Sequence, residues 1–427
     1  MLKTEYPRIG ETVLSETLEN GLRVIVVPKP GYRRRYAFFA TRYGGMDMRF
    51  RLGGVWQDTP AGIAHYLEHK MFDTREGNAL QMLSQNGAEP NAFTSNSMTA
   101  YYFDCTEHFE ENLRILLSFV SEPWFTADSV EKERGIIAQE IRMTEDSPDW
   151  QVYKNLLSCL YRSNPARVPV AGTVESIRRI TPQTLYDCHR AFYTPSNMVL
   201  CVVGDLEPDP VLSAVRDILP SARGETIERD YGAEEELCAF EKSSTRAMEI
   251  AVPQFLAGFK CPAPAEGAEL FRQGLIGELA CDILLGESSP LYLKLYDEGL
   301  INGSFGSDFD QLPGAAYFYA GGECKEPERV AHAIMDEAAR LAREGLNEDF
   351  YRQIIRANFG ASLRSLNSFE NIAINMADGW FRGFDAYRFP ELYDSITRED
   401  IADFLRENIT EERLAMSLLV PAKEAEA

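Results

Sequence analysis

Two of the five histidines in this 427-residue chain lie close together, in the segment A-H-Y-L-E-H at 64–69. The apolar pattern around them predicts a helix over 61–72. Residues four apart share one face of a helix, with Cβ atoms roughly 5–6 Å apart, so His65 and His69 can direct both imidazoles at one metal ion. Glu68 shares that face but is angled away from the pair, which suits a carboxylate that holds a reacting water without binding the metal. The alternative is a pair of ordinary histidines on an amphipathic helix, which would have to account for the adjacent Glu68 as well.

A catalytic zinc site needs a third protein ligand and an open fourth position. The three remaining histidines offer no obvious pairing with the motif. A predicted helix over 129–144 carries Glu133 and Glu140, which are seven residues and two turns apart and therefore lie on one face. One carboxylate can bind the metal while the other supports the site from behind. The spacing leaves open which carboxylate has which role, and charged helix faces without a metal are common.

The elements that must position these side chains alternate between strands and helices. Strand-like runs are found at 22–27, 36–43, 99–105 and 199–203, and helical stretches at 61–72, 113–120 and 129–144. Long helices beside a mixed or antiparallel sheet make an α+β domain. We therefore expect the predicted metal site to lie in such a domain.

A long-range repeat indicates that this domain occurs twice. Ile180 opens a helical stretch that is followed by an apolar run at 198–203, and Ile396 opens another that is followed by an apolar run at 414–420. The offset is 216 residues, close to half the chain. Such a period indicates a duplicated domain, whereas chance likeness between two common helix–strand units is the alternative.

Three segments follow from this repeat. We expect an N-terminal catalytic, zinc-binding α+β domain over 1–220, an acidic and exposed linker over 221–244, and a C-terminal homologous α+β domain over 245–427. At the same offset the metal motif falls on residues that cannot replace it: Cys281, Leu284, Leu285 and Arg356. The C-terminal domain is therefore expected to be non-catalytic.

The chain is acidic, with a formal net charge of -23 and a sequence pI of about 4.7. Such a surface repels phosphate backbones and anionic membranes, so neither nucleic acid nor a membrane is expected as a partner. The first ten residues show no signal peptide, and no run reaches the roughly 18 apolar residues that span a bilayer. The eight cysteines contain no C-x-x-C pair and are expected to be reduced thiols. These features favour a cytoplasmic protein.

At these residues the sequence resembles the insulinase/pitrilysin family of zinc peptidases, the inverzincins with an H-x-x-E-H motif. The resemblance implies two homologous α+β domains and Zn2+ as the cofactor. It implies Glu140, the later residue of an E-x(6)-E pair, as the third metal ligand, and Glu133 as the supporting acid of the catalytic site. The residues Asn91, Ala92 and Phe93 look like the family's edge strand, to which a bound peptide is expected to add a strand.

The likeness covers the whole chain, most strongly residues 20–205, but it departs from the family in the second half. The family usually supplies there an Arg and a Tyr, seven residues apart, that hold the substrate carbonyl and the oxyanion. The corresponding residues are Tyr296 and Gly303. Two-subunit relatives divide the metal and the Arg/Tyr pair between two chains. The resemblance therefore implies a heterodimer in which a homologous partner chain supplies this pair, with a homodimer or a substitute such as Tyr292 as alternatives.

The sequence predicts a zinc metallopeptidase that hydrolyses peptides or small unfolded proteins through a metal-activated water. Zinc would lower the pKa of this water toward 7, and Glu68 would act as the general base that passes its proton to the leaving amine. A non-catalytic peptide-binding or core subunit of the same fold is the alternative. The joint presence of His65, Glu68, His69 and Glu140 favours the enzyme.

Overall fold

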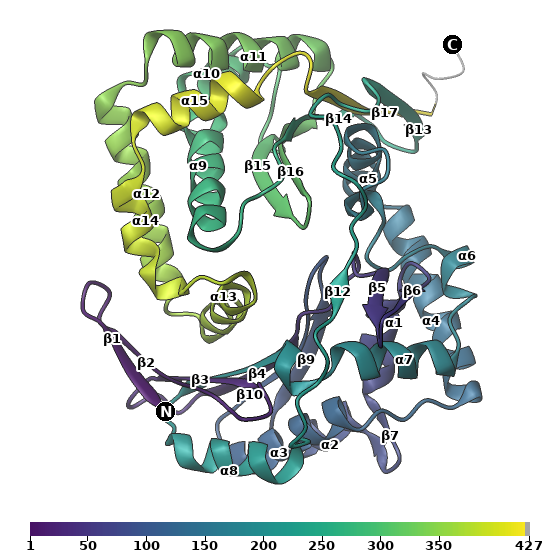
Figure 1. Cartoon of the computed structure of the whole chain (residues 1–427). Coiled ribbons are helices and arrows are strands. Elements are labelled where there is room, and N and C mark those ends of the chain that lie inside the picture. Colours follow the sequence, from purple (N-terminus) through teal and green to yellow (C-terminus); the bar gives the residue numbers. More distant parts are fainter. Residues whose placement is uncertain (423–427) are drawn as a thin grey trace. The chain divides into compact units, whose positions relative to one another are not determined.

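The computed structural model describes residues 1–422, whose contacts divide into two compact units (Figure 1). The first unit contains residues 1–141, 168–231 and 363–388, and the second contains 142–167, 232–362 and the residues from 389 onward. The sequence predicted continuous domains over 1–220 and 245–427. The units differ from these domains by two exchanged segments: 142–167 belongs to the second unit, and 363–388 belongs to the first.

A seven-stranded sheet forms the centre of the first unit. Its strands are β1 (Leu2–Tyr6), β2 (Glu11–Thr17), β3 (Arg23–Pro28), β4 (Arg35–Thr41), β9 (Glu89–Thr94), β10 (Thr99–Cys105) and β11 (Met198–Gly204). Their order is β1-β2-β3-β11-β4-β10-β9, with β11 parallel to β3 and the other neighbours antiparallel. β11 is buried along its whole length, as expected for a central strand that both faces cover. β9 lies at an edge of the sheet.

Helices of the first unit bury a large apolar cluster against one face of this sheet. They are α1 (Ile63–Met71), α2 (Ala79–Gln85), α3 (Phe109–Ser121), α4 (Ala127–Glu145), α6 (Val174–Ile177), α7 (Pro182–Phe192) and α8 (Pro208–Ile218). Side chains alternate between the two faces of a strand, so Val24 and Val26 of β3 join this cluster, whereas Ile25 and Val27 join a second one on the opposite face.

The second unit repeats this plan with a five-stranded sheet. Its strands are β13 (Ser243–Met248), β14 (Gln254–Cys261), β15 (Gly306–Leu312), β16 (Ala315–Glu323) and β17 (Leu414–Pro421), in the order β13-β17-β14-β16-β15. Its helices include α9 (Gly267–Leu285), α10 (Pro290–Asp297), α11 (Pro327–Glu344), most of α12 (Glu348–Ser365), α14 (Phe389–Ser395) and α15 (Arg398–Asn408). β17 is parallel to β13 and antiparallel to β14, as β11 is to β3 and β4.

Each exchanged segment carries a helix that covers one face of a sheet. α13 (Phe369–Arg382) packs on β4 and β11 in the first unit, and α5 (Pro148–Leu160) packs on β13, β14 and β17 in the second. A sheet that is buried on both faces needs helices on both. The period of an amphipathic helix does not say which sheet the helix will cover, so the sequence pattern could not reveal this exchange.

The predicted repeat is visible as matching elements at the predicted offset. α7 and β11 begin at residues 182 and 198, and α15 and β17 begin at residues 398 and 414. Thr181 and Thr397 cap the two helices in the same way, each with its side chain in a capping box. The expected fold class, two homologous α+β domains, is confirmed.

The predicted linker over 221–244 is attached to the first unit near its middle. Tyr231 donates its hydroxyl proton to the carboxylate of Asp47 at 2.8 Å, and the Nε atom of Arg229 lies 3.0 Å from the same carboxylate. Asp47 is 2% exposed, so it needs these partners to remain charged. This part of the linker is therefore fixed, although most linker residues are exposed as predicted.

Glu235 attaches the next part of the linker to the second unit. Its carboxylate accepts the backbone N–H groups of residues 162–164 and lies 3.0 Å from the ammonium of Lys260. Burial alone would raise the pKa of Glu235, but these donors outweigh it and lower the pKa to about 2. The acidic run thus includes one carboxylate with a structural role.

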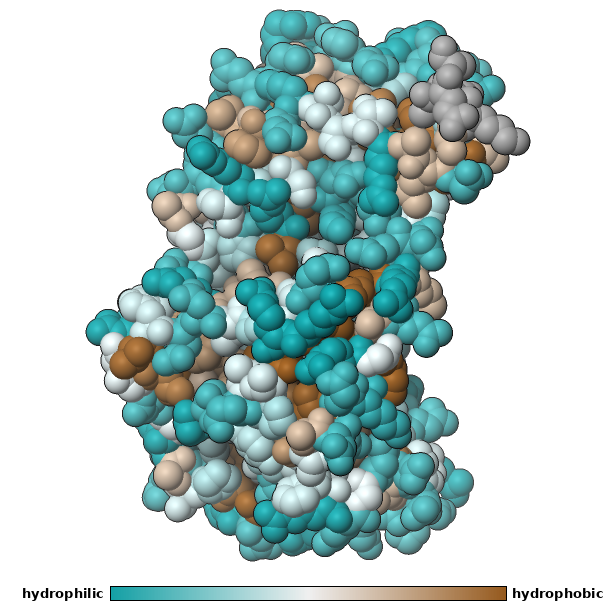
Figure 2. Space-filling model, turned by 90° about the vertical axis from the view of Figure 1, so that its right-hand side faces the viewer, coloured by the Kyte–Doolittle hydropathy of each residue, from teal (hydrophilic) through white to brown (hydrophobic). Residues whose placement is uncertain are grey.

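The surface agrees with the acidic, polar composition. Figure 2 shows a mostly hydrophilic face on which hydrophobic side chains are scattered. Among residues 1–422, no helix combines the length and the apolar character that crossing a bilayer requires. The eight cysteines all lie in this part of the chain and are free, and seven of them are buried.

Candidate metal centre

The helix that carries the motif begins at a place where two chain segments approach each other closely. Gly62 has φ +91° at the N-cap of α1, and a Cβ atom there would lie 2.4 Å from the carbonyl oxygen of Ala171. Gly172 has φ +72°, and its Cβ atom would lie 2.4 Å from the carbonyl oxygen of Ala61. Ser176 donates its hydroxyl proton to that same carbonyl at 2.7 Å. Only glycine fits such a contact, so the start of α1 is fixed by 171–176.

Packing then joins α1 to α4. Ile63, Tyr66 and Leu67 of α1 are buried in the apolar cluster of the first unit. The hydroxyl of Tyr66 donates to the backbone carbonyl of Val130, near the start of α4. Because α1 lies on the sheet and α4 is tied to α1, the polar face of α1 is turned toward the carboxylates of α4.

This arrangement brings three of the predicted residues together. His65, His69 and Glu140 each offer a ligand atom within 4.8 Å of the other two, and they form the only such group among the described residues. The Nε2 atom of His65 lies 3.5 Å from one oxygen of Glu140, and the Nε2 atom of His69 lies 3.5 Å from the other oxygen. The two imidazole rings are 4.7 Å apart and inclined by 62°.

The donor set and its spacing fit a zinc ion. Two ligand atoms at about 2.0–2.1 Å from one tetrahedral zinc lie about 3.3 Å apart. Each imidazole Nε2 lies 3.5 Å from its own oxygen of Glu140, and one ligand atom from each of the three residues lies within 4.8 Å of the others. Two imidazoles and one carboxylate also leave a fourth position open, as catalytic zinc sites do. The group is partly accessible, with side-chain exposures of 12% for His65, 24% for His69 and 38% for Glu140.

Glu133 stands behind one of the imidazoles. Its carboxylate lies 3.0 Å from the Nδ1 atom of His69, so the proton of this imidazole belongs on Nδ1 and the Nε2 lone pair faces Glu140. Helix geometry had placed Glu133 and Glu140 on one face without distinguishing them. Packing separates them, because Glu140 reaches both Nε2 atoms and Glu133 reaches only Nδ1 of His69.

The charges of the site favour a cation. The imidazole of His65 lowers the pKa of the Glu140 carboxyl, and His69 lowers that of Glu133, although burial opposes both shifts. Burial alone would lower the pKa of His69, but its hydrogen bond with Glu133 and the charges of Glu68 and Glu140 raise it. The two carboxylates beside the imidazoles make these surroundings negative, which suits a divalent cation.

Glu68 lies next to the ligand group without belonging to it. Its side chain is buried, with an exposure of 8%, and its Oε2 atom accepts the hydroxyl proton of Thr94 at 2.6 Å. Thr94 belongs to the stretch that resembles the family's edge strand, but the sequence gave it no role. Nothing local could have shown the contact, because the two residues meet only when α1 packs on the sheet.

The three expected substrate-binding residues lie in β9. Among residues 1–422, β9 pairs with β10 alone, so its outer edge keeps backbone groups that can pair with another strand. Asn91 is exposed, and Ala92 and Phe93 are partly exposed. The strand ends at Thr94, beside Glu68, so this edge leads to the candidate metal centre.

The second unit has other residues at the positions that correspond to the predicted metal ligands, 216 residues further along the chain. Cys281 lies buried in α9 and Arg356 lies in α12. Tyr296, which stands where the family usually has Arg, lies in α10 with its ring 6.1 Å from that of Tyr292 and parallel to it within 13°. Gly303 lies between α10 and β15. These residues offer neither the metal ligands nor the Arg/Tyr pair.

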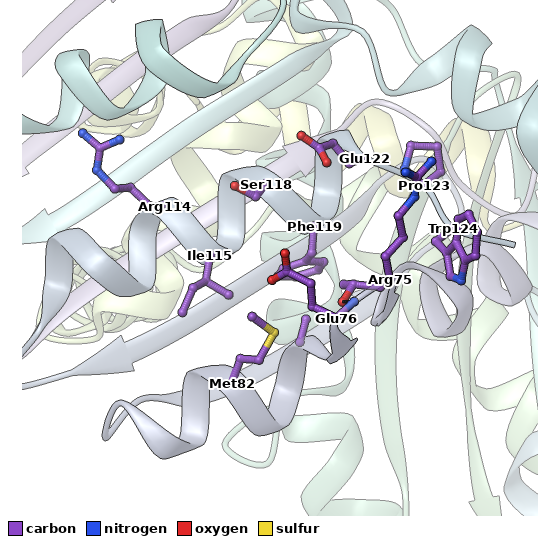
Figure 3. Close-up of a pocket in the computed structure, with 12 residues that line it drawn as sticks. Arg75, Glu76, Met82, Arg114, Ile115, Ser118, Phe119, Glu122, Pro123 and Trp124 are labelled. Carbon is purple, nitrogen blue, oxygen red and sulfur yellow. Dashed lines mark hydrogen bonds between the residues drawn. The ribbon is translucent and has the colours of Figure 1, made fainter.

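A separate pocket of about 640 Å³ lies beside α2 and α3 in the first unit (Figure 3). Met82, Ile115 and Phe119 line it, and the guanidinium of Arg75 lies 4.7 Å from the ring centre of Trp124. None of the predicted site residues lines this pocket. It is therefore not part of the candidate metal centre.

Two family models match the chain. The model described as insulinase (peptidase family M16) matches residues 53–174, and the model described as the peptidase M16 inactive domain matches residues 179–358. The first match contains the candidate ligands His65, His69 and Glu140, and also Glu68 and Glu133. The second covers most of the half in which the motif is lost.

Individual relatives agree over nearly the whole length. The chain is 38% identical over 423 residues to the uncharacterized zinc protease YmfH of Bacillus subtilis (strain 168), covering 98% of each chain. The crystal structure of an M16-like peptidase from Alicyclobacillus acidocaldarius matches with a TM-score of 0.93 at 33% identity, covering 98% of this chain and 100% of that one. A peptidase M16 inactive domain from Pseudomonas fluorescens matches with a TM-score of 0.79 at 17% identity, covering 96% of this chain and 98% of that one, which shows the fold alone.

Proposed function

Because the chain belongs to the insulinase family of peptidases (peptidase family M16), we propose that it is a zinc-dependent metallopeptidase. The observation that carries the proposal is the grouping of His65, His69 and Glu140, in which each imidazole Nε2 lies 3.5 Å from its own oxygen of one carboxylate. The name zinc protease, given to a relative of nearly equal length, supports the choice of metal and reaction.

In the proposed reaction His65, His69 and Glu140 hold Zn2+, and Glu133 orients His69 through its Nδ1 atom. When bound, zinc supplies a Lewis acid that polarises a peptide carbonyl and makes water more acidic. Glu68 accepts a proton from the attacking water and delivers it to the leaving amine, so that a C–O bond forms while the peptide C–N bond breaks.

The proposed substrates are peptides or small unfolded proteins in an extended conformation. The support is the outer edge of β9, where main-chain groups at 91–93 can pair with an added strand. Main-chain pairing grips an extended chain with little preference for sequence. A folded protein can offer such a strand only from an exposed edge, loop or terminus.

We further propose that the protein works as the metal-bearing subunit of a heterodimer, with a homologous partner chain that supplies the Arg and Tyr. The support is Tyr296 and Gly303, neither of which can replace a guanidinium. Purification from the native host would identify the partner. Full peptidase activity of the single chain, with no gain from any added partner, would remove the reason for a heterodimer and would favour the chain alone or a homodimer.

The proposed compartment is the cytoplasm. All eight cysteines are free, and seven of them are buried. A reducing compartment keeps such thiols in this form, whereas an oxidising one favours disulfides. Fractionation of native cells with an antibody against the chain tests this assignment directly.

The central experiment measures zinc and hydrolysis on the same protein, purified with zinc present and assayed on quenched fluorescent peptides with and without the co-purifying partner. We expect about one zinc per chain, and loss of hydrolysis on chelation with recovery on zinc addition. Glu68→Gln should keep the zinc and lose roughly 100-fold or more of the activity.

The second candidate is a non-catalytic peptide-binding or core subunit of the same fold. Its support is the other half of the chain, which has this fold but carries Cys281 and Arg356 in place of two of the metal ligands. Zinc-loaded wild type that binds peptides but hydrolyses none, with or without its partner, would establish this candidate and overturn the peptidase.

A further inference from the structure

Thr94 is the last residue of β9, and its hydroxyl donates a hydrogen bond of 2.6 Å to Oε2 of Glu68. We propose that Thr94 is a positioning residue, which holds the general base in the orientation that proton transfer needs. The proposal rests on the proposed peptidase function, because it gives Thr94 a task in that reaction. Thr94 itself acts through Glu68.

The direction of this hydrogen bond is fixed by chemistry. An ionised carboxylate only accepts, so the single hydroxyl proton of Thr94 must point at Glu68. Charge-assisted O–H···O bonds are about 2.5–2.7 Å long, and the observed distance lies in this range. Glu68 is buried, so the bond compensates one carboxylate oxygen for the water it has lost. The other oxygen, Oε1, is left to act as the base.

Thr94 is in turn held from the opposite strand. Thr99 of β10 stands directly across from it and is fully buried. The hydroxyl of Thr99 lies 2.9 Å from the carbonyl oxygen of Tyr43 and 3.3 Å from the hydroxyl oxygen of Thr94. The single hydroxyl proton of Thr99 has the Tyr43 carbonyl as its nearer acceptor. The proton of Thr94 is directed at Glu68 because Oε2 of Glu68 lies 2.6 Å away, nearer than the Thr99 hydroxyl at 3.3 Å.

The backbone around Thr94 is also fixed. The β9–β10 turn closes with a hydrogen bond of 2.7 Å from Ser95 N to Met98 O, and Gly45 N donates to Ser95 O at 2.9 Å. A Cβ atom on Gly44 would lie 2.4 Å from the backbone of the turn, so the chain at 44–45 is packed tightly against it. Because this backbone is held in place, the Thr94 side chain starts from a fixed point. Such a fixed point suits a residue that must orient Glu68.

This placement links substrate binding to catalysis. The residues expected to pair with a peptide, 91–93, come directly before Thr94 in the same strand. A peptide paired on the outer edge of β9 would therefore lie along the same strand that carries the hydroxyl holding Glu68. Thr94 is neither one of the residues expected to pair with the peptide nor one of the expected metal ligands. Removing its hydroxyl should lower turnover and leave peptide binding and zinc binding intact.

The test compares Thr94→Val, which removes the hydroxyl at nearly constant shape, with Thr94→Ser, which keeps it. We expect T94V to lower kcat roughly 10- to 100-fold, as a misplaced catalytic group does, with KM and zinc content within about twofold of wild type. T94S should stay within about threefold of wild type. Thr12→Val is the matched control, because Thr12 is a partly buried threonine in β2 of the same sheet, and it should leave kcat unchanged.

A crystal structure of zinc-loaded T94V supplies a readout besides activity. The proposal expects the Glu68 carboxylate to rotate or to adopt more than one conformer while His65, His69 and Glu140 stay in place. Unchanged kcat with an unmoved Glu68 would overturn it. A loss of kcat that T94S shares, or that comes with zinc loss or a lower melting temperature, would assign Thr94 a merely structural role and would also overturn it.

Failure of the proposed function would look different. In that case wild type and Glu68→Gln are equally inactive, whatever stands at residue 94. The position of the Glu68 carboxylate in wild-type and T94V crystals still decides whether Thr94 holds it. If T94V does not fold, Thr94→Ala with the same crystal and zinc measurements replaces it.

Discussion

A metal ligand on a helix must be held from behind if its lone pair is to face the metal, and Glu133, 3.0 Å from Nδ1 of His69, is placed to do this for a zinc-bound His69. We predict that Glu133→Gln weakens zinc binding about 10- to 100-fold, because an amide orients the imidazole less well and adds no negative charge. Competition with a coloured chelator measures the affinity. Glu131→Gln is the control, since Glu131 lies in the same helix, is 70% exposed and pairs with Arg134. Equal affinities in both variants would contradict the role of Glu133.

For individual side chains, the sequence predicts those relative positions that one helix determines by itself. His65, Glu68 and His69 share one turn, so their relation follows from helix geometry before any packing is known. Thr94 is different, because it meets Glu68 only after β9 and β10 have paired and α1 has packed on them. A contact that depends on strand register and helix placement leaves no signal in local spacing.

The helix α1 illustrates how an element is held in place by its start. We predict that Gly62→Ala destabilises the first unit by about 3 kcal/mol or more, because alanine is strained at φ +91° and its Cβ atom would lie 2.4 Å from Ala171 O. It should also lower the zinc content, since the start of α1 sets the ligand positions. Chemical denaturation followed by zinc analysis measures both effects.

The matched control for this prediction is Gly31→Ala. Gly31 has a similar φ of +82° but no atom within 4 Å of its Cβ position, so only the backbone cost of about 1 kcal/mol applies. If both variants lost the same stability, close contact between α1 and 171–172 would not be what matters. If both kept full zinc content, the start of α1 would not control the ligand positions.

His189 shows how a histidine outside the site stabilises the packing of two elements. It lies in α7, and its Nε2 atom is 3.0 Å from the carbonyl oxygen of Val120 in α3. Burial lowers the pKa of His189 to about 4, against the opposing effect of this hydrogen bond. The unfolded chain has a pKa near 6.5 at this residue, so it binds more protons than the folded chain between about pH 4 and 6.5.

The contribution of His189 to stability therefore rises with pH across this range and is lost on acidification. We predict that the free energy of unfolding of His189→Gln falls less than that of wild type between pH 7 and pH 4, by about 2–3 kcal/mol. The glutamine keeps a donor near Val120 but does not titrate. Urea unfolding of both proteins in chelator, to exclude the metal, measures the difference. Parallel pH curves would show that His189 is not buried as a neutral imidazole.

The periodic elements were predictable because one residue pattern determines each of them. The strand predicted at 99–105 is β10, and the helix predicted at 129–144 is α4 with a few more residues at its ends. The exchange of α5 and α13 was not predictable, because both helices are amphipathic and the two sheets are alike. Their partners depend on the path of the whole chain.

Across the whole molecule, the same plan is used twice with different chemistry. Both sheets have a central strand that is parallel to one neighbour and antiparallel to the other, at an offset of 216 residues in the chain. The first copy keeps the ligand group, and the second has Cys281 and Arg356 instead. The described residues therefore contain a single candidate metal centre, although the plan of the domain is used twice.

The exchange of helices makes the metal centre depend on residues far along the chain. Ile372 of α13 is 1% exposed and belongs to the cluster formed with Val27 and Phe38, on the sheet face opposite to α1. We predict that Ile372→Asp destabilises the first unit by about 3 kcal/mol or more, because a buried charge without a partner is costly. Denaturant should then release zinc at a lower concentration than from wild type, which a zinc indicator dye detects.

Asn375→Asp is the control, because Asn375 is exposed on the same helix and a surface change should stay within about 0.5 kcal/mol. Two continuous domains would give the opposite result for Ile372→Asp. A helix that stabilised only the C-terminal half would leave zinc release unchanged while that half unfolded early. The zinc-release midpoint therefore distinguishes an interleaved chain from two consecutive domains, because it reports on the first unit through a substitution more than 300 residues from the motif.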